Sequence, residues 1–143
     1  MNREIKFKGK SSETSGWCDA GIWVTGNFVE WYFDAAYKKG NPKTPTIFFI
    51  KNGTQHRTAV HRESVGQFIG LLGKNGVEVY ENDFVKATDK KSRLITRGLV
   101  EYDSTICKFM LKNSDGGYDF LQFYESHDIE VIGNRFEAAE MSA

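Results

Sequence analysis

Apolar and polar residues alternate in many short stretches of this chain, and no window of twelve or more residues keeps a 3.6-residue apolar period with a cap at each end. Alternation places successive side chains on opposite faces and is typical of β-strands. The pattern therefore predicts a mainly β protein, with at most a frayed helical turn after Glu137. The expected strands are 5–8, 22–33, 46–50, 58–60, 67–72, 77–80, 84–87, 94–102, 106–112, 118–123 and 128–132.

Glycine-containing dipeptides separate several of these strands. Asn52-Gly53 and Asn75-Gly76 each lie between two of them, and Asn-Gly suits a type I′ hairpin. We interpret Asn75 and Gly76 as a structural turn with positive φ at both residues. Gly26-Asn27, inside an aromatic strand, suggests a bulge or bend. The five short strands after residue 83 predict a small closed barrel.

Composition indicates a folded protein that stays in the compartment where it is made. Lys plus Arg and Asp plus Glu number 19 each, no apolar run is long enough for a membrane span, and no hydrophobic segment follows the first basic residues. With two cysteines, a disulfide scaffold is not expected, so Cys18 and Cys107 are interpreted as reduced thiols in a cytoplasm. Cys107 shares a predicted strand face with Phe109 and Leu111, which favours a small core residue.

Several blocks of sequence resemble the YopX family of phage and prophage proteins. They are 64–71 (SVGQFIGL) and 74–85 (KNGVEVYENDFV), with 5–10 (IKFKGK) and 21–26 (GIWVTG) near the start and 129–134 (IEVIGN) near the end. The family usually has Gly-Asp where this chain has Asn82-Asp83, and the loop 11–20 is longer than typical.

This resemblance implies a mainly β protein of a mobile element, in the cytoplasm of a bacterial host, with no established activity. It also implies an irregular N-terminal β portion, residues 1–65, packed on a C-terminal SH3-like barrel, residues 66–143.

The residues offer little for catalysis. His56, His61 and His127 accompany no metal-binding motif, and His56 and His61, five apart, face opposite sides of an extended strand. A phosphate-binding glycine loop is absent, and the carboxylate pairs of the chain fit solvated turns. We therefore expect no catalytic residue, cofactor or metal, and no enzyme.

Charge is distributed unevenly along the chain. Residues 1–70 carry ten basic and six acidic side chains, whereas residues 71–143 carry nine and thirteen. Within 86–97, one acidic residue, Asp89, accompanies five basic ones, with Tyr102 and Tyr118 as further candidates for stacking on bases. This basic segment is either a solvated turn or a nucleic-acid surface. Its members are Lys86, Lys90, Lys91, Arg93 and Arg97.

A run of aromatic residues supplies a second candidate surface. These side chains either pack in the core or form an interface with a second copy or with an unidentified phage or host protein. We therefore expect an accessory protein that acts as a non-enzymatic protein-interaction or self-assembling module, with no membrane partner. The alternative is a nucleic-acid-binding small barrel that uses the basic segment. The aromatic candidates are Trp23, Phe28, Trp31, Tyr32 and Phe33.

Overall fold

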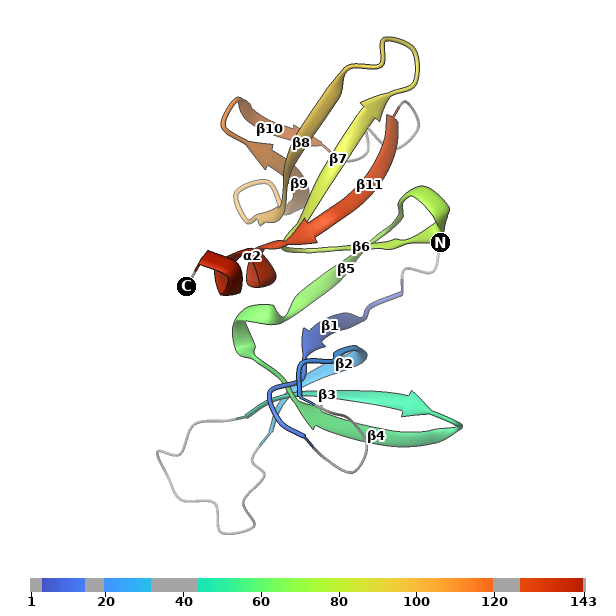
Figure 1. Ribbon diagram of the computed structural model, residues 1–143, viewed down its shortest axis with the longest axis vertical. Helices are drawn as coiled ribbons and strands as arrows, with labels where there is room; N and C mark the ends of the chain where they lie inside the picture. Colours follow the sequence, from blue (N-terminus) through green and yellow to red (C-terminus); the bar gives the residue numbers. More distant parts are fainter. Residues whose placement is uncertain (1–3, 15–19, 32–43, 120–126, 143) are drawn as a thin grey trace. The chain divides into compact units, whose positions relative to one another are not determined.

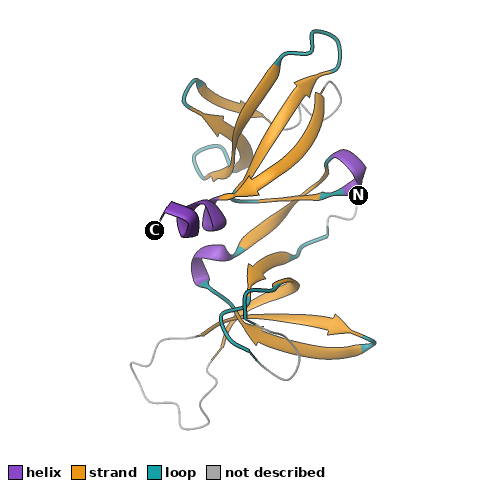
Figure 2. Ribbon diagram, viewed as in Figure 1, coloured by secondary structure: helices purple, strands orange, loops and turns teal. Residues whose placement is uncertain are grey.

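The computed structural model describes residues 4–14, 20–31, 44–119 and 127–142. The chain divides into two compact units: an N-terminal unit, Glu4–Gln67, and a C-terminal unit, Phe68–Ala143. Nearly all of the regular structure is antiparallel strand (Figures 1 and 2), so the predicted mainly β class is confirmed. The boundary between the units falls inside strand β5, Gly66–Leu72.

The N-terminal unit is built on four antiparallel strands in the order β4-β3-β2-β1. The start of β5 pairs with β1, through Gly66 and Gln67. A short 3₁₀ helix, η1, covers Arg62–Ser64. The four strands are β1 (Phe7–Lys10), β2 (Trp23–Trp31), β3 (Thr44–Lys51) and β4 (Thr54–Ala59).

Strand β2 changes partner in its middle, at the predicted bend. Up to Gly26 it pairs with β1, and from Asn27 onward it pairs with β3. A Cβ atom on Gly26 would lie 1.9 Å from the carbonyl oxygen of Phe48. Only glycine allows the two backbones to approach this closely, because any side chain would collide with the neighbouring strand.

The core of the N-terminal unit combines aliphatic side chains with buried hydroxyl groups. Val24, Ile47 and Val60 are buried, and Phe7, Phe28, Phe49 and Val65 pack against them. Ser11 and Thr58 are also buried, and their hydroxyl oxygens lie 2.9 Å apart in a hydrogen bond. Pairing satisfies both hydroxyls in a place where an unpaired polar group would be costly.

The C-terminal unit contains a five-stranded antiparallel sheet in the order β10-β9-β8-β7-β11. From Phe68 onward, β5 forms a hairpin with β6 (Glu78–Tyr80), and Ile69 and Val79 of that hairpin pack into the same core as the sheet. That this unit is an SH3-like barrel stays a prediction. The sheet strands are β7 (Asp83–Asp89), β8 (Ile95–Asp103), β9 (Lys108–Asn113), β10 (Gly116–Asp119) and β11 (His127–Asn134).

Asparagine and glycine occupy the positive-φ positions of the turns. Asn52 and Gly53 have φ of 53° and 77°, and Asn75 and Gly76, at the end of the short 3₁₀ segment η2 (Lys74–Gly76), have 61° and 74°. Both pairs therefore have the signs of a type I′ turn. Asn82 has φ of 73°. Asparagine tolerates this left-handed region, which explains how it replaces the glycine expected there from the family.

The expectation for Cys107 is wrong. Its thiol is exposed, its φ is 54°, and its Sγ atom lies 3.7 Å from the carbonyl oxygen of Ser104, to which it donates. Strand β9 starts at Lys108, one residue later. Because Cys107 belongs to the turn, the alternation that places Phe109 and Leu111 toward the core does not extend back to it.

The C-terminal end is more regular than expected. Instead of a frayed turn, residues Arg135–Ser142 form an α-helix, labelled α2. Asn134 caps it, because its Oδ1 accepts a hydrogen bond from the backbone N–H of Glu137 at 2.9 Å. No helix in the described part of the chain is long and apolar enough to cross a bilayer.

Candidate functional site

The basic segment lies on the β7–β8 hairpin of the C-terminal unit, and Asp89 organises its loop. One oxygen of the Asp89 carboxylate, Oδ1, accepts hydrogen bonds from the backbone N–H groups of Lys91 and Ser92, at 2.8 and 3.0 Å. The Asp89 carbonyl oxygen also accepts from the N–H of Arg93 at 2.9 Å, and Arg93 has φ of 63°. An aspartate that binds the backbone two and three residues ahead holds such a turn in one conformation.

These contacts also act on the charge of Asp89. The N–H groups of Ser92 and Lys91 lower its carboxyl pKa, and the nearby His127 and Lys91 charges act in the same direction. Oδ2 of Asp89 lies 3.6 Å from Nε2 of His127, the first residue of β11. The loop is therefore organised around an ionised carboxylate at neutral pH.

The tip of the hairpin combines cations with aliphatic side chains. Lys90, Lys91 and Arg93 are all exposed. Leu94 and Ile95 follow directly and are 72% and 45% exposed. The surface at this tip thus offers both positive charge and apolar area.

The two other basic candidates lie further along the hairpin, on the sheet itself. Lys86 of β7 is directly opposite Arg97 of β8. On its other side, Lys86 is directly opposite Glu130 of β11. Side chains opposite each other in an antiparallel pair are close neighbours, so Glu130 offsets part of this positive charge. Counting charges along 86–97 misses this residue, since strand pairing brings it from elsewhere in the chain.

Elsewhere on the C-terminal unit, other basic side chains are paired with acidic ones. Lys108 contacts Asp119 and Lys112 contacts Asp103, each at 3.1 Å, and Arg135 contacts Glu101. The surface of the C-terminal unit is therefore mixed in charge.

The two tyrosines proposed as stacking platforms differ in exposure. Tyr102 is 47% exposed, and its ring packs edge-on against Phe109 with centroids 5.2 Å apart. Tyr118 is partly buried and packs against the core of the C-terminal unit. Tyr102 thus presents more of its ring to solvent than Tyr118 does.

The aromatic run belongs to β2, in the N-terminal unit. The Phe28 ring packs in the core beside Phe7, with centroids 5.8 Å apart, and Trp23 lies under the ammonium group of Lys8 at 5.2 Å. Trp31 is the last residue of β2, whereas Tyr32 and Phe33 lie outside the described residues. Phe28 is thus occupied in core packing.

The three histidines occupy different elements. His56 lies on β4 and packs against Phe49 with ring centroids 5.8 Å apart, His61 precedes η1, and His127 begins β11 beside Asp89. Across the described segments, no three His, Cys, Asp or Glu side chains are arranged to hold a metal ion.

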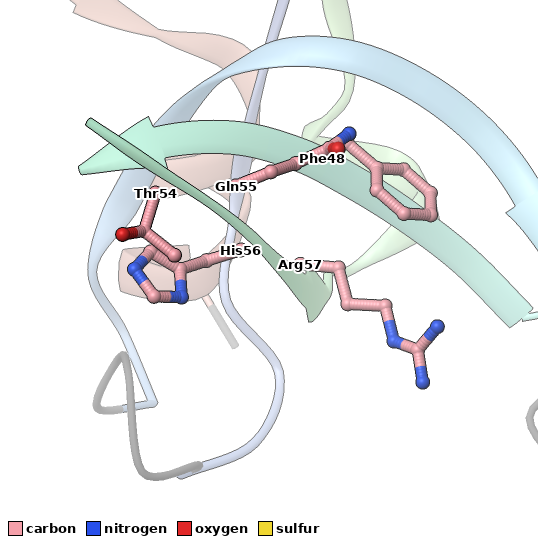
Figure 3. Close-up of a pocket in the computed structure, with 5 residues that line it drawn as sticks. All are labelled: Phe48, Thr54, Gln55, His56 and Arg57. Atoms are coloured by element: carbon pink, nitrogen blue, oxygen red, sulfur yellow. The ribbon is translucent and has the colours of Figure 1, made fainter.

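A cavity of about 310 Å³ lies along β4 (Figure 3), and the sequence reasoning did not anticipate it. Phe48 of β3 and four consecutive residues of β4 line it: Thr54, Gln55, His56 and Arg57. In Figure 3, Phe48 and Arg57 project to one side of β4, and Thr54 and His56 project to the other. A smaller cavity of about 170 Å³, in the C-terminal unit, is lined by Leu72, Gly73, Lys74, His127, Asp128 and Ile129.

In a comparison with protein families, the model of the family described as YopX protein matches residues 23–141. The match covers most of the chain, which therefore belongs to the YopX family. No curated protein and no solved structure matches the chain.

Proposed function

We propose that this YopX-family chain is a phage- or prophage-encoded accessory protein that acts in the cytoplasm of a bacterial host by binding and not by catalysis. Its binding element is the tip of the β7–β8 hairpin. One observation carries the proposal: a loop held by the Asp89 carboxylate presents Lys91 and Arg93 next to the exposed side chains of Leu94 and Ile95.

The combination of charge and apolar area favours a protein partner. Cations steer association and set specificity, whereas burial of aliphatic side chains supplies a favourable hydrophobic contribution to binding. A phosphate backbone would use the cations but would leave Leu94 and Ile95 in water. A protein surface that has acidic groups around an apolar recess would use both.

Self-assembly is one form of this proposal. Residues 68–143 carry nine basic and thirteen acidic side chains, so the basic residues of the hairpin tip belong to a unit with a net negative charge. The acidic surface of a second copy would be complementary to it. An unidentified phage or host protein with similar acidic character is the other form.

The test compares two charge reversals in one unit. Lys91→Glu changes the hairpin tip, and Lys74→Glu changes an exposed lysine on the η2 turn as a matched control. Leu94→Ser tests the apolar part of the tip. Wild type and the three variants are measured by light scattering with size-exclusion chromatography, and by pull-down from prophage-induced cells after nuclease treatment. We expect Lys91→Glu and Leu94→Ser to weaken assembly or capture by about tenfold, with little effect of Lys74→Glu.

A strict monomer at micromolar concentration and low salt would remove self-assembly and leave a heterologous partner. Assembly or capture that is equally strong in Lys91→Glu, Leu94→Ser and wild type would refute the role of the hairpin tip.

Nucleic acid is the second candidate ligand, because the cross-strand pair Lys86 and Arg97 extends the positive charge of the tip along the sheet. If all five basic residues contacted phosphates, log affinity would fall against log salt with a slope of about −4.5 for duplex DNA and about −3.5 for a single strand. Labelled oligonucleotides titrated at about 50 and 200 mM salt measure this slope. Changing Lys90, Lys91 and Arg93 to Ala should flatten it by about 2 to 3. An unchanged slope would refute this candidate.

A further inference from the structure

Strand β4 stands at the end of the strand order in the N-terminal unit, and no other described strand pairs with its outer edge. Sheet edges expose backbone donors and acceptors, which extended peptides can use to add a strand. The cavity of about 310 Å³ lies along this strand (Figure 3), so there is space beside it.

The direction of the peptide groups on β4 follows from one hydrogen bond. The N–H of Val60 donates to the carbonyl oxygen of Pro45 on the β3 side, at 3.0 Å. Backbone groups alternate in direction along a strand, so the N–H and C=O groups of Gln55, Arg57 and Ala59 point to the outer edge. A second hydrogen bond supports this direction. The Ala59 carbonyl oxygen accepts at 3.0 Å from the N–H of Ser12, which lies outside the β3–β4 hairpin.

The chain itself already pairs with the far end of this edge. Ser11 forms an antiparallel bridge with Val60, and the His61 N–H donates to the Lys10 carbonyl at 2.9 Å. Within the described residues 4–14, this pairing ends at Ser12, since Glu13 lies in a bend. Residues Thr54–Arg57, beside the cavity, therefore belong to the same strand edge that pairs with Ser11 and Ser12 at its other end.

The side chains around the cavity indicate what kind of peptide fits. They include a half-buried Phe48 ring, the amide of Gln55 and the guanidinium of Arg57, and none of the described lining residues is acidic. Over the whole N-terminal unit, residues 4–67 carry nine basic and six acidic side chains. This charge balance favours a negatively charged segment over a basic one.

We propose that the edge of β4 from Thr54 to Arg57 binds an extended acidic segment of a partner protein by strand addition. Backbone groups of the segment exchange hydrogen bonds with Gln55, and alternate side chains enter the cavity on the two sides of β4. A carboxylate on the side of Phe48 reaches Arg57. This site lies in the other unit from the hairpin tip, so either proposal can fail while the other holds.

The experiment uses the full chain and a fluorescein-labelled heptapeptide, acetyl-Val-Glu-Val-Glu-Val-Glu-Val-amide, followed by fluorescence anisotropy. Gln55→Pro removes an N–H that points away from β3, so the β3–β4 pairing loses no donor, and proline is tolerated at such edge positions. Gln55→Ala is the matched control that keeps the N–H. We expect Gln55→Pro to weaken peptide binding by about tenfold and Gln55→Ala by about twofold or less.

Two further measurements test the proposal without the Gln55→Pro variant, in case proline disturbs folding. A heptapeptide with N-methylated backbone amides should lose binding to the wild-type chain, because it cannot donate to the edge. Arg57→Glu should weaken binding of the acidic peptide and strengthen binding of a peptide with Lys in place of Glu.

Three results would overturn the proposal: no binding up to about 1 mM peptide, equal binding of the N-methylated peptide, or equal binding of the acidic and lysine peptides. Displacement of the acidic peptide by a single-stranded oligonucleotide would assign the edge to nucleic acid instead. A dimer that Gln55→Pro dissociates would assign it to a second copy.

Discussion

The cores of the two units are built differently. In the C-terminal unit, Val85, Val100, Leu111 and Ile129 belong to one continuous aliphatic cluster of buried side chains. In the N-terminal unit, a smaller aliphatic cluster around Ile47 adjoins buried hydroxyl groups and a glycine at which two backbones nearly touch. The C-terminal unit also has a buried carboxylate, Asp83, and a glycine close to a neighbouring backbone, Gly98, so the two units differ in degree. The N-terminal unit has the smaller aliphatic cluster, the buried hydroxyl pair and the closer backbone approach, at Gly26.

This difference predicts how each unit tolerates substitution. Apolar packing is not directional, so a core of aliphatic side chains can absorb small changes by shifting neighbours. A carbonyl oxygen in contact with a glycine, or a pair of buried hydroxyls, cannot adapt in this way, since displacing the backbone or leaving a polar atom unpaired costs free energy directly. The N-terminal unit should therefore be sensitive to changes of a single methyl group.

The largest effect is expected from Gly26→Ala. The new Cβ would lie 1.9 Å from the Phe48 carbonyl oxygen, so β2 and β3 must separate at the point where β2 changes partner. We expect the free energy of unfolding to fall by about 3 to 5 kcal/mol, at the upper end of single-substitution effects. Chemical denaturation measures this change.

Gly133→Ala is the control for Gly26→Ala, because no heavy atom lies within 4 Å of the position its Cβ would take. Its cost should be below about 1 kcal/mol. Hydrogen exchange of the β3 and β8 amides then shows whether the loss is confined to the N-terminal unit. Equal stabilities of the Gly26→Ala and Gly133→Ala variants would mean that the close backbone approach at Gly26 does not contribute to the stability of the N-terminal unit.

The elements that the sequence predicted well are those with local signals. Alternation predicted a strand at or near each strand of the described residues, although it placed β4 at 58–60 and the strand covers Thr54–Ala59. The Asn75-Gly76 pair occurs at a turn with positive φ at both residues. Alternation does not predict the exposure of Cys107, because this residue still belongs to the turn and β9 begins only at Lys108. The C-terminal helix had a local signal too: Asn134, followed three residues later by Glu137, is a helix N-cap pattern.

The candidate sites depend on pairings between distant residues, which a local reading does not supply. Glu130 beside Lys86 follows from the register of β11 on β7, and no pattern within 86–97 reveals it. The cavity along β4 was also missed. The two-residue Asn52-Gly53 loop sets Phe48 opposite Arg57, but the return strand was expected only at 58–60, and Arg57 precedes that range.

Gly76→Val tests whether turn strain is the same in both units. Gly76 has φ of 74° and Gly53 has 77°, and no heavy atom lies within 4 Å of a Cβ added at either position. The cost therefore comes from backbone strain and not from a clash, and we expect about 1 to 3 kcal/mol for Val at each turn. Gly76→Asn should cost less, since asparagine tolerates this region. Thermal melts of Gly76→Val that match wild type would contradict the type I′ turn.

Thr58→Val tests the hydroxyl pair of the N-terminal unit. Valine has nearly the shape of threonine and is more apolar, yet it removes the hydrogen bond of 2.9 Å to the buried Ser11 oxygen, which keeps its bond to the Glu13 carbonyl oxygen at 2.8 Å. We expect a loss of about 0.5 to 1.5 kcal/mol in denaturant unfolding. Thr96→Val, on β8 of the C-terminal unit, is the control, because none of the hydrogen bonds among described side chains involves Thr96. A neutral Thr58→Val would show that the hydrogen bond between Ser11 and Thr58 does not stabilise the N-terminal unit.

The smallest effect concerns charge at the surface of the C-terminal unit. The Thr105 hydroxyl and the Lys112 ammonium bind the Asp103 carboxylate and hold its pKa at about 2, below the ordinary 3.8. A pKa lowered by folding contributes stability that is present above about pH 4 and is lost as the pH falls toward 2. Asp103→Asn should therefore be slightly less stable than wild type at pH 7, and the difference should disappear near pH 2. Carboxyl NMR titration should place the Asp103 midpoint near 2 and, in Thr105→Val, nearer to 3.8. A midpoint of 3.8 in the wild type would show that the contacts with Thr105 and Lys112 do not favour the ionised Asp103 carboxylate and do not stabilise the β8–β9 turn through its charge.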